Sequence, residues 1–339
     1  MRGFTAHCLG ISARVLTPVT LNEHKGSALR GALYHTLRAR FCALREMDEC
    51  ATCPLWQACP VCTLVSTLAP DNRVGPDAAR PYTIQPSLDG DKTSYRPGDV
   101  LEFGLTLYAE AMQLFPYVIM ALKGLEQEGL GRRTPENGYR RGALRVERVW
   151  AANPLSGERH EVIQQGDGLV QVPDVPVTHD QVLERCAALA EARSLRMTLL
   201  TPTRLTHRGS LVKPGEMAFA TVLARLLDRL ESLAATFTDT PLELDFGALV
   251  RSAAEVRTVV EETRWVELRS YSTRQRRATP IGGLVGRVEF VADDWRPYLP
   301  WLVWGQFTHV GKDAVKGDGW YRVWDGDRGL DSADGGHDH

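Results

Sequence analysis

GFTAHCLGISARVL (residues 3–16), followed by KGSALRGALYHTLRARFCALREM (residues 25–47), decides the first half of the fold. The first segment alternates apolar positions among strand formers, which predicts a β-strand. In the second, apolar residues recur every three or four positions, which predicts a helix over about 27–47 with one stripe facing a sheet. That stripe consists of Leu29, Leu33, Leu37, Phe41 and Leu44.

The next segments complete a recognisable order of elements. RPYTIQPSL (80–88) and DVLEFGLTLYAEA (99–111) read as extended, residues 113–127 as an apolar helix, and ALRVERVWAA (143–152) as a strand. The order is strand, helix, strand, strand, helix, strand. It is the ferredoxin-like order, which puts both helices on one face of an antiparallel sheet.

The second half repeats this order from about residue 194. We expect strands at LRMTLLTPTRLT (195–206), RWVELRSYS (264–272), GGLVGRVEFV (282–291) and GWYRVW (319–324), with helices over 216–235 and 295–307 and a helical insertion over 244–260.

The predicted fold class is therefore α+β. It comprises two tandem ferredoxin-like (RRM-like) domains, residues 1–190 and 191–325, with a small cysteine-rich metal loop in the first. A Gly- and Pro-containing hairpin or linker occupies 160–180, and the polar tail 326–339 is expected to be disordered.

Composition limits the class of protein. The chain has 339 residues, 43% hydrophobic and 24% charged, which suits a globular protein of two domains. Its longest apolar runs, such as AMQLFPYVIMAL (111–122), are shorter than a membrane span, and the N-terminus lacks a signal-peptide core. We therefore expect a cytoplasmic protein with no membrane partner. The net charge of −2 means that any nucleic-acid binding must depend on local basic patches.

Four of the seven cysteines form the pattern C-x2-C-x5-C-x2-C, namely Cys50, Cys53, Cys59 and Cys62. Two such pairs can surround a tetrahedral zinc ion, and four protein ligands leave no position for substrate, so the metal would be structural. An iron–sulfur cluster accepts the same ligands and stays open as an alternative. Unliganded core thiols fit poorly, because Pro54 and Pro60 interrupt the segment. The other cysteines, Cys8, Cys42 and Cys186, are expected to pack as small apolar residues.

A histidine lies on the predicted first helix, on the face opposite its apolar stripe. His35 shares this face with Arg38, and taken alone it reads most simply as a solvated surface residue. Histidine is also the side chain that transfers protons near neutral pH, and Lys25 and Arg30 could stabilise a developing negative charge. Such a set can cleave RNA without metal. A base takes the 2′-hydroxyl proton, and that oxygen then attacks the adjacent phosphate.

Several blocks of the chain, taken in order, resemble one family. They are KGSALRGALYHTLRARFC (25–42), CATCPLWQACPVCTLV (50–65), RPYTIQPSL (80–88), residues 95–133 with the overlapping GLGRRT (129–134), YSTRQRRATPIGGLVGRVEF (271–290) and FTHVGKDAVKGDGWYRV (307–323). Together they resemble the CRISPR repeat-processing (pre-crRNA) endoribonucleases of the RAMP superfamily, in the branch with an N-terminal four-cysteine cluster.

The resemblance implies two ferredoxin-like domains that bind CRISPR repeat RNA. It also implies metal-independent cleavage once per repeat, giving a 2′,3′-cyclic phosphate and a 5′-hydroxyl, with no cofactor for catalysis. His35 matches the family's first-helix general acid or base. Family members differ in the assisting residues, so Lys25, Arg30 and Tyr34 are candidates by proximity alone.

Basic residues of the second half are the expected RNA surface. The window from Arg264 to Arg287 holds six arginines and one acid, Glu267, and so carries +5 on an acidic chain. Such runs are usually solvated faces, but here turn-forming residues accompany the charge, which favours a loop along a phosphate backbone. The candidate RNA-binding residues are Arg38, Arg269, Arg274, Arg276, Arg277, Arg287, and Lys312 and Lys316 of a glycine-rich loop. His309, just before that loop, is expected to be structural.

Three functions remain open. The first is the repeat-processing endoribonuclease that matures crRNA. The second is a catalytically inactive RAMP subunit that binds RNA inside a CRISPR effector complex. The third is a zinc-stabilised RNA-binding protein unrelated to CRISPR, which would explain the cysteines and arginines but not the ordered series of blocks.

Overall fold

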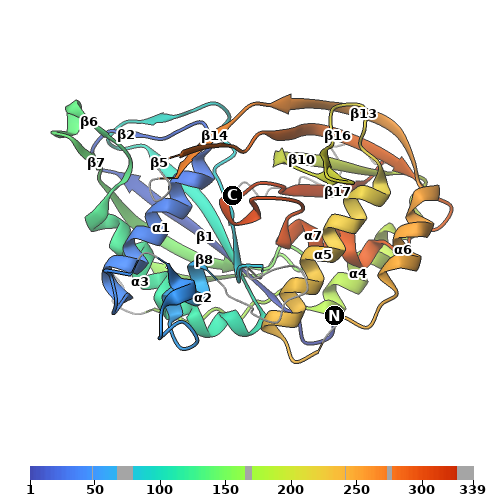
Figure 1. Cartoon of the computed structure of the whole chain (residues 1–339), viewed down its shortest axis with the longest axis horizontal. Helices are drawn as coiled ribbons and strands as arrows, with labels where there is room; N and C mark the ends of the chain where they lie inside the picture. Colours follow the sequence, from blue (N-terminus) through green and yellow to red (C-terminus); the bar gives the residue numbers. More distant parts are fainter. Residues whose placement is uncertain (48, 67–78, 165–169, 241, 273–276, 327–339) are drawn as a thin grey trace. The chain divides into compact units, whose positions relative to one another are not determined.

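The computed structural model describes residues 1–339 except 48, 67–78, 165–169, 241, 273–276 and 327–339, and it gives no side-chain surroundings for 270–272 and 277–279. The chain divides into two compact units (Figure 1). The N-terminal domain is Gly3–Val177 with Ser232–Thr240. The C-terminal domain comprises the other described residues, Met1 and Arg2 included.

The N-terminal domain has the ferredoxin-like order of elements. They are β1 (Ala6–Val15), α1 (Lys25–Phe41), β3 (Tyr82–Gln85), β5 (Val100–Tyr108), α3 (Phe115–Glu128) and β8 (Leu144–Ala152). Its sheet is ordered β3-β5-β1-β8-β9, with every pair antiparallel. The added edge strand β9 (Arg159–Gln164) occupies the start of the predicted hairpin or linker over 160–180.

The two helices of this domain pack closely on each other. Leu29, Leu33 and Leu37 of α1 are at most 5% exposed, as the apolar stripe predicted. Gly124 of α3 allows a close approach, because a Cβ there would lie 2.1 Å from Cγ2 of Thr36 on α1. Ridges that meet at a glycine bring helix axes closer than larger side chains permit.

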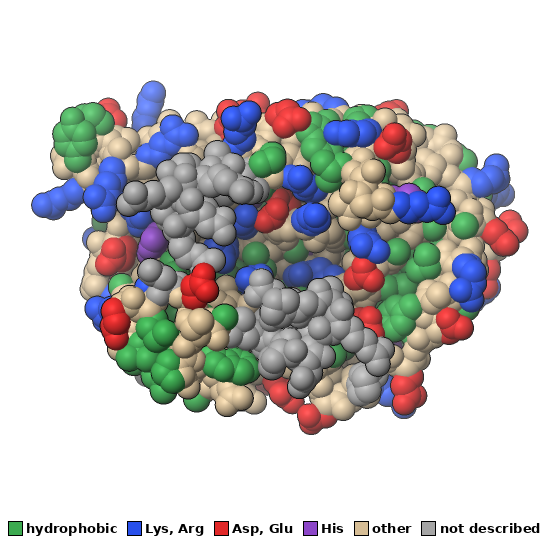
Figure 2. Space-filling view, viewed as in Figure 1, with side chains coloured by type: hydrophobic (Ala, Val, Ile, Leu, Met, Phe, Trp, Pro, Cys, Tyr) green, Lys and Arg blue, Asp and Glu red, His purple; other side chains and the backbone are tan. Residues whose placement is uncertain are grey.

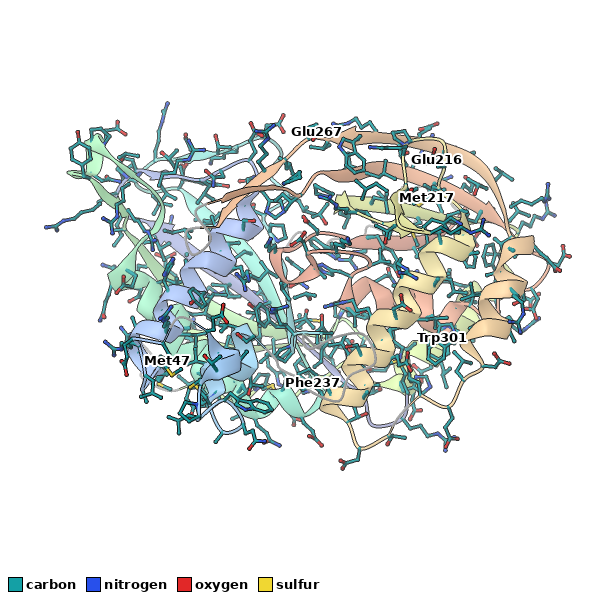
Figure 3. The ribbon with its side chains drawn as sticks, in the orientation of Figure 1. Met47, Glu216, Met217, Phe237, Glu267 and Trp301 are labelled. Carbon is teal, nitrogen blue, oxygen red and sulfur yellow. The ribbon has the colours of Figure 1, made fainter. Side chains whose placement is uncertain are left out.

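The first helix is shorter than predicted. It ends at Phe41 rather than near residue 47, because Cys42 is already extended. The Arg38 guanidinium then holds the following turn by donating to the carbonyls of Arg45 (2.7 Å) and Met47 (2.9 Å); Met47 is labelled in Figure 3. These are backbone contacts that periodicity does not reveal.

The C-terminal domain repeats the same order. Its elements are β10 (Leu195–Thr203), α5 (Phe219–Phe237), β13 (Arg257–Val266), β16 (Gly283–Val291), α7 (Leu299–Thr308) and β17 (Tyr321–Asp325), and its sheet is ordered β13-β16-β10-β17. The last residues of α5, 232–237, group with the N-terminal unit. The prediction of two ferredoxin-like domains is thereby confirmed.

Two boundaries in this half differ from the prediction. The helical insertion ends early: α6 (Phe246–Ser252) and one 3₁₀ turn precede β13, which pairs with β16 along its length apart from a bulge at Val259. A further helix that was not predicted, α4 (His179–Leu189), starts at a capping box formed by Thr178 and Gln181 and packs on α7. The compact units therefore divide at 177/178, before α4, whereas the sequence suggested 190/191.

Short elements complete the fold. They are α2 (Pro60–Val65) and the two-stranded pairs β2 (Val19–Thr20) with β4 (Ser94–Tyr95), β6 (Leu130–Thr134) with β7 (Arg140–Gly142), β11 (Thr206–His207) with β12 (Ser210–Leu211), and β14 (Arg269–Ser272) with β15 (Arg277–Pro280). None of the helices in the described residues combines the length and apolarity that crossing a bilayer requires.

Candidate functional site

A pocket of about 630 Å³ opens in the N-terminal domain beside the middle of α1. Its walls come from α1, the C-terminal end of α3 and the hairpin β6–β7. The lining residues are His35, Ala39, Glu126, Gln127, Glu128, Gly129, Arg133, Tyr139, Arg140, Arg141 and Ala143. Figure 2 shows Lys and Arg side chains gathered where Figure 1 labels this hairpin.

His35 is the titratable group on the α1 wall. It is half-buried, and its ring meets that of Tyr34 edge-on at 5.4 Å between centroids. Burial lowers the pKa of His35, the positive charge of Arg141 lowers it further, and Arg38 adds to this; Glu128 acts in the opposite direction. The neutral imidazole is therefore favoured near neutral pH, which is the form that accepts a proton.

Arginines of the β6–β7 hairpin supply positive charge to the pocket. Within the described part of the chain, the side chains of Arg133, Arg140 and Arg141 make neither a hydrogen bond nor an ion pair. Their neighbour Arg132 differs, because its Nε donates to Asn22 Oδ1 at 2.6 Å and it does not line the pocket. Unpaired guanidinium groups beside a proton carrier are suited to binding a phosphate.

Glycines let this hairpin lie against β2. A Cβ on Gly131, whose φ is +86°, would come within 2.4 Å of the Thr20 carbonyl oxygen. A Cβ on Gly142 would be equally close to the carbonyl oxygen of Pro18, which also accepts a hydrogen bond from Asn137 Nδ2 at 2.7 Å. The sequence thus anchors both ends and the turn of the hairpin, and this anchoring presents its arginines to His35.

The acids of the pocket are not equivalent. Glu126 accepts hydrogen bonds from the Val146 amide (3.0 Å) and the Lys123 ammonium (3.1 Å) through the same oxygen. Glu128, at the end of α3, is exposed and acts on His35 only through its charge. The pocket therefore retains an excess of positive charge.

The other predicted catalytic residues lie outside this lining. Lys25 is buried, and its ammonium forms an ion pair with Asp89 and donates to the Gly90 carbonyl at 2.9 Å. Tyr95 donates to the second oxygen of Asp89 at 2.7 Å. Lys25 thus fixes the start of α1 to the 89–95 segment, and as placed it is not available to a phosphate.

Arg30 and Tyr34 are half-buried and do not line the pocket either. The Tyr34 hydroxyl accepts a hydrogen bond from Arg38 Nη1 at 3.0 Å. Arg38, predicted to bind RNA, is committed to this hydroxyl and to the turn after α1, although its charge still acts on His35.

The remaining predicted RNA-binding residues belong to the C-terminal domain. Arg274 and Arg276 lie outside the described residues, as does the side chain of Arg277. Arg269 and Lys312 are exposed. Arg287 is engaged in two hydrogen bonds to Glu262 (2.7 and 2.9 Å), and Lys316 forms an ion pair with Asp313 at 2.7 Å.

The glycine-rich loop is held by its own domain. Thr201 Oγ1 donates to the Gly317 carbonyl at 2.7 Å, and the Gly319 amide donates to Pro202 at 3.0 Å. His309 is fully buried, with Nδ1 3.2 Å from the Asp318 carbonyl oxygen, and burial lowers its pKa to about 3. His309 is therefore a neutral packing group, as expected.

In the four-cysteine segment some of the thiols lie close together, but the four do not all meet at one position. Burial and the neighbouring thiols of Cys50 and Cys59 raise the pKa of the Cys62 thiol. Cys53 is also buried. Among the described residues, no three His, Cys, Asp or Glu side chains already surround a common metal position. Cys62 nevertheless lies beside the thiols of Cys50 and Cys59.

Two family models match the chain. One, AF_1859_N, described as an N-terminal domain, matches residues 4–175. The second, described as CRISPR-associated endoribonuclease Cas6, matches residues 197–321. A comparison with curated protein sequences gave no match.

Solved structures share the fold at low identity. A chain of a partial Cas6-RT-Cas1–Cas2 complex matches with a TM-score of 0.60 and 12% identity over 95% of this chain and 46% of that one. A Cas6 product complex matches with a TM-score of 0.55 and 13% identity over 94% and 99%. Thermus thermophilus Cas6 matches with a TM-score of 0.51 and 14% identity over 96% and 100%. The chain thus spans less than half of the length of the first of these proteins and nearly the whole length of the other two.

Proposed function

Because the chain belongs to the RAMP-type CRISPR repeat-processing proteins, we propose that it is an endoribonuclease that binds CRISPR repeat RNA in the cytoplasm and cleaves it once per repeat. The observation that carries this proposal is the pocket in which His35, with its lowered pKa, faces arginines that have no partner within the described residues. Maturation of crRNA is the consequence of such a cut.

The reaction needs only the groups of the pocket. Neutral His35 takes the proton of a 2′-hydroxyl, and that oxygen forms a bond to the adjacent phosphorus. The bond from phosphorus to the 5′-oxygen breaks, and this oxygen takes up the proton that His35 has accepted, which restores the neutral imidazole. The products are a 2′,3′-cyclic phosphate and a 5′-hydroxyl. Arg133, Arg140 and Arg141 stabilise the negative charge that grows on the phosphoryl oxygens.

The first test is cleavage of RNA transcribed from the CRISPR repeat of the encoding genome, in EDTA. One specific cut is expected, and a 2′-deoxy substitution at the cut nucleotide should block it. His35→Ala should reduce the single-turnover rate by at least about 100-fold and leave the Kd within a few fold, because it removes proton transfer rather than phosphate contacts. His35→Gln keeps a polar side chain of similar size and should behave alike.

Two results would overturn the assignment. Tight binding of the repeat by the wild-type chain without any cut would favour an inactive RNA-binding subunit of an effector complex. Cleavage that survives in His35→Ala would move the reaction to another site.

We propose further that Cys50, Cys53, Cys59 and Cys62 hold a structural zinc ion. The grouping of Cys50, Cys59 and Cys62 supports this, as does a chain of turns between the pairs: the amides of Cys53, Trp56 and Ala58 each donate three residues back. The ion would stabilise the segment after α1 and take no part in cleavage.

A further inference from the structure

Tyr139 is an exposed aromatic residue at the tip of the β6–β7 hairpin. Its side chain is 72% exposed, and no ring or cation contact to it occurs within the described part of the chain. Large aromatic side chains contribute stability by burying their rings, and this ring has no such packing partner among the described residues. Packing does not explain its presence.

Backbone preference does not explain it either. Gly138 and Tyr139 both have positive φ, +61° and +60°, and the Tyr139 amide donates to the Thr134 carbonyl at 2.9 Å to close the turn. Glycine or asparagine adopts this conformation far more readily than an aromatic residue does. A residue in a strained conformation that stays largely exposed points to a role outside the fold.

The position of the ring indicates that role. Tyr139 lines the same pocket as His35, and the two residues that follow it are Arg140 and Arg141. Guanidinium groups bind phosphates, and exposed aromatic rings stack on unpaired bases. One nucleotide could therefore meet both kinds of group at the site where its 2′-hydroxyl meets the imidazole.

We propose that Tyr139 stacks on an unpaired nucleobase beside the scissile phosphate while Arg140 and Arg141 hold the phosphate itself; this rests on the function proposed above. In-line attack requires the 2′-oxygen, phosphorus and 5′-oxygen to align, which a nucleotide stacked in an A-form helix does not allow. The ring holds the nucleotide out of the helical stack.

The test uses the full chain and a repeat RNA that cannot be cleaved, with a 2′-deoxy nucleotide at the cut and 5-iodouridine at single unpaired positions around it. Irradiation joins iodouridine to an aromatic ring stacked on it, and trypsin then releases residues 134–140, TPENGYR, which contain one aromatic residue. If the RNA is never cut, the iodouridine is placed at each unpaired position in turn.

Substitutions at Tyr139 distinguish the contribution of the ring from that of the backbone conformation. Tyr139→Phe keeps the ring and should keep both the cross-link and the affinity. Tyr139→Gly and Tyr139→Asn remove the ring while accepting the positive φ, and should lose the cross-link and weaken RNA binding by about tenfold, as loss of one base–aromatic stack does. Because both suit the turn, their folding is expected to be intact, which a melting curve checks.

The outcomes are distinct. Wild-type cross-linking confined to other peptides, or Tyr139→Gly binding and cross-linking like the wild type, overturns the stacking role. If this happens while His35-dependent cleavage persists, the endoribonuclease stands and the inference fails. If residues 134–140 cross-link but cleavable RNA is never cut, the stacking role stands and the proposed reaction fails.

Discussion

Replacing Arg141 by Gln should impair cleavage in two measurable ways. Arg141 is the charged group that acts most strongly on His35, and it lines the same pocket. A unit charge about 4 Å from a developing phosphoryl charge contributes about 4 kcal/mol at an effective dielectric constant of about 20. Arg133, Arg140 and water compensate for part of this. We expect a loss of about 2–3 kcal/mol of transition-state stabilisation, a fall of about 30- to 160-fold in rate.

The second effect is on the pH dependence. Arg141 lowers the pKa of His35, so its removal lets that pKa rise towards its ordinary value. The neutral imidazole is the reactive form, and the rate falls as pH drops through the pKa. In Arg141→Gln the acidic limb of the pH–rate profile should therefore lie at higher pH than in the wild type.

The assay is single-turnover cleavage of repeat RNA at saturating protein over about pH 5–9. Arg132→Gln is the matched control, because Arg132 lies on the same hairpin, is exposed, and is bonded to Asn22 away from the pocket. Arg132→Gln should leave the cleavage rate within about twofold of the wild-type rate and the acidic limb of the pH–rate profile at the wild-type pH. An equal loss in both variants, or an unmoved limb in Arg141→Gln, would refute this account of the pocket.

Three further predictions concern residues outside the pocket. Lys25→Met should lower the free energy of unfolding in urea titration by about 2–4 kcal/mol, because Asp89 loses its ion-pair partner. The folded variant should cleave RNA at the wild-type single-turnover rate. Unchanged stability with a lower cleavage rate would instead indicate that Lys25 takes part in catalysis. Cys59→Ser should reduce the bound zinc measured by elemental analysis and lower the melting temperature, and a variant that keeps both would exclude the metal site. Replacing Arg276 and Arg277 by Ala should weaken RNA binding and reduce the slope of log Kd against log salt by about 1.4–1.8, so an unchanged slope would remove that segment from the interface.

The order of elements could be predicted from the sequence because it depends on local periodicity. Leu29, Leu33 and Leu37 face the core as their spacing requires, and the same spacing turns His35 away from it. The limits of elements were less predictable. Helix α1 ends where Arg38 binds carbonyls beyond it, and β13 begins inside the predicted insertion because β16 pairs with it.

The sequence contains a pattern that points to the arginines of the pocket. GLGRRTPENGYRRGA (129–143) has one arginine pair on each side of the turn-forming PENG. This pattern predicts a hairpin that brings the two pairs of like charges together. Nothing in that segment, however, shows that it would lie beside a helix about 100 residues earlier. Strand pairing of β6 with β7 and the approach of glycines to β2 bring it there.

By itself, then, the sequence determined two ferredoxin-like domains and an imidazole on the solvent side of the first helix, since both follow from hydrophobic spacing along one element. Only the tertiary structure decided which cationic side chains lie beside that imidazole. Each residue turns a helix by about 100°, so Lys25 and Arg30, near His35 in sequence, point elsewhere, and Lys25 is buried against Asp89. The distant hairpin supplies Arg141 instead, because charges interact through space and not along the chain.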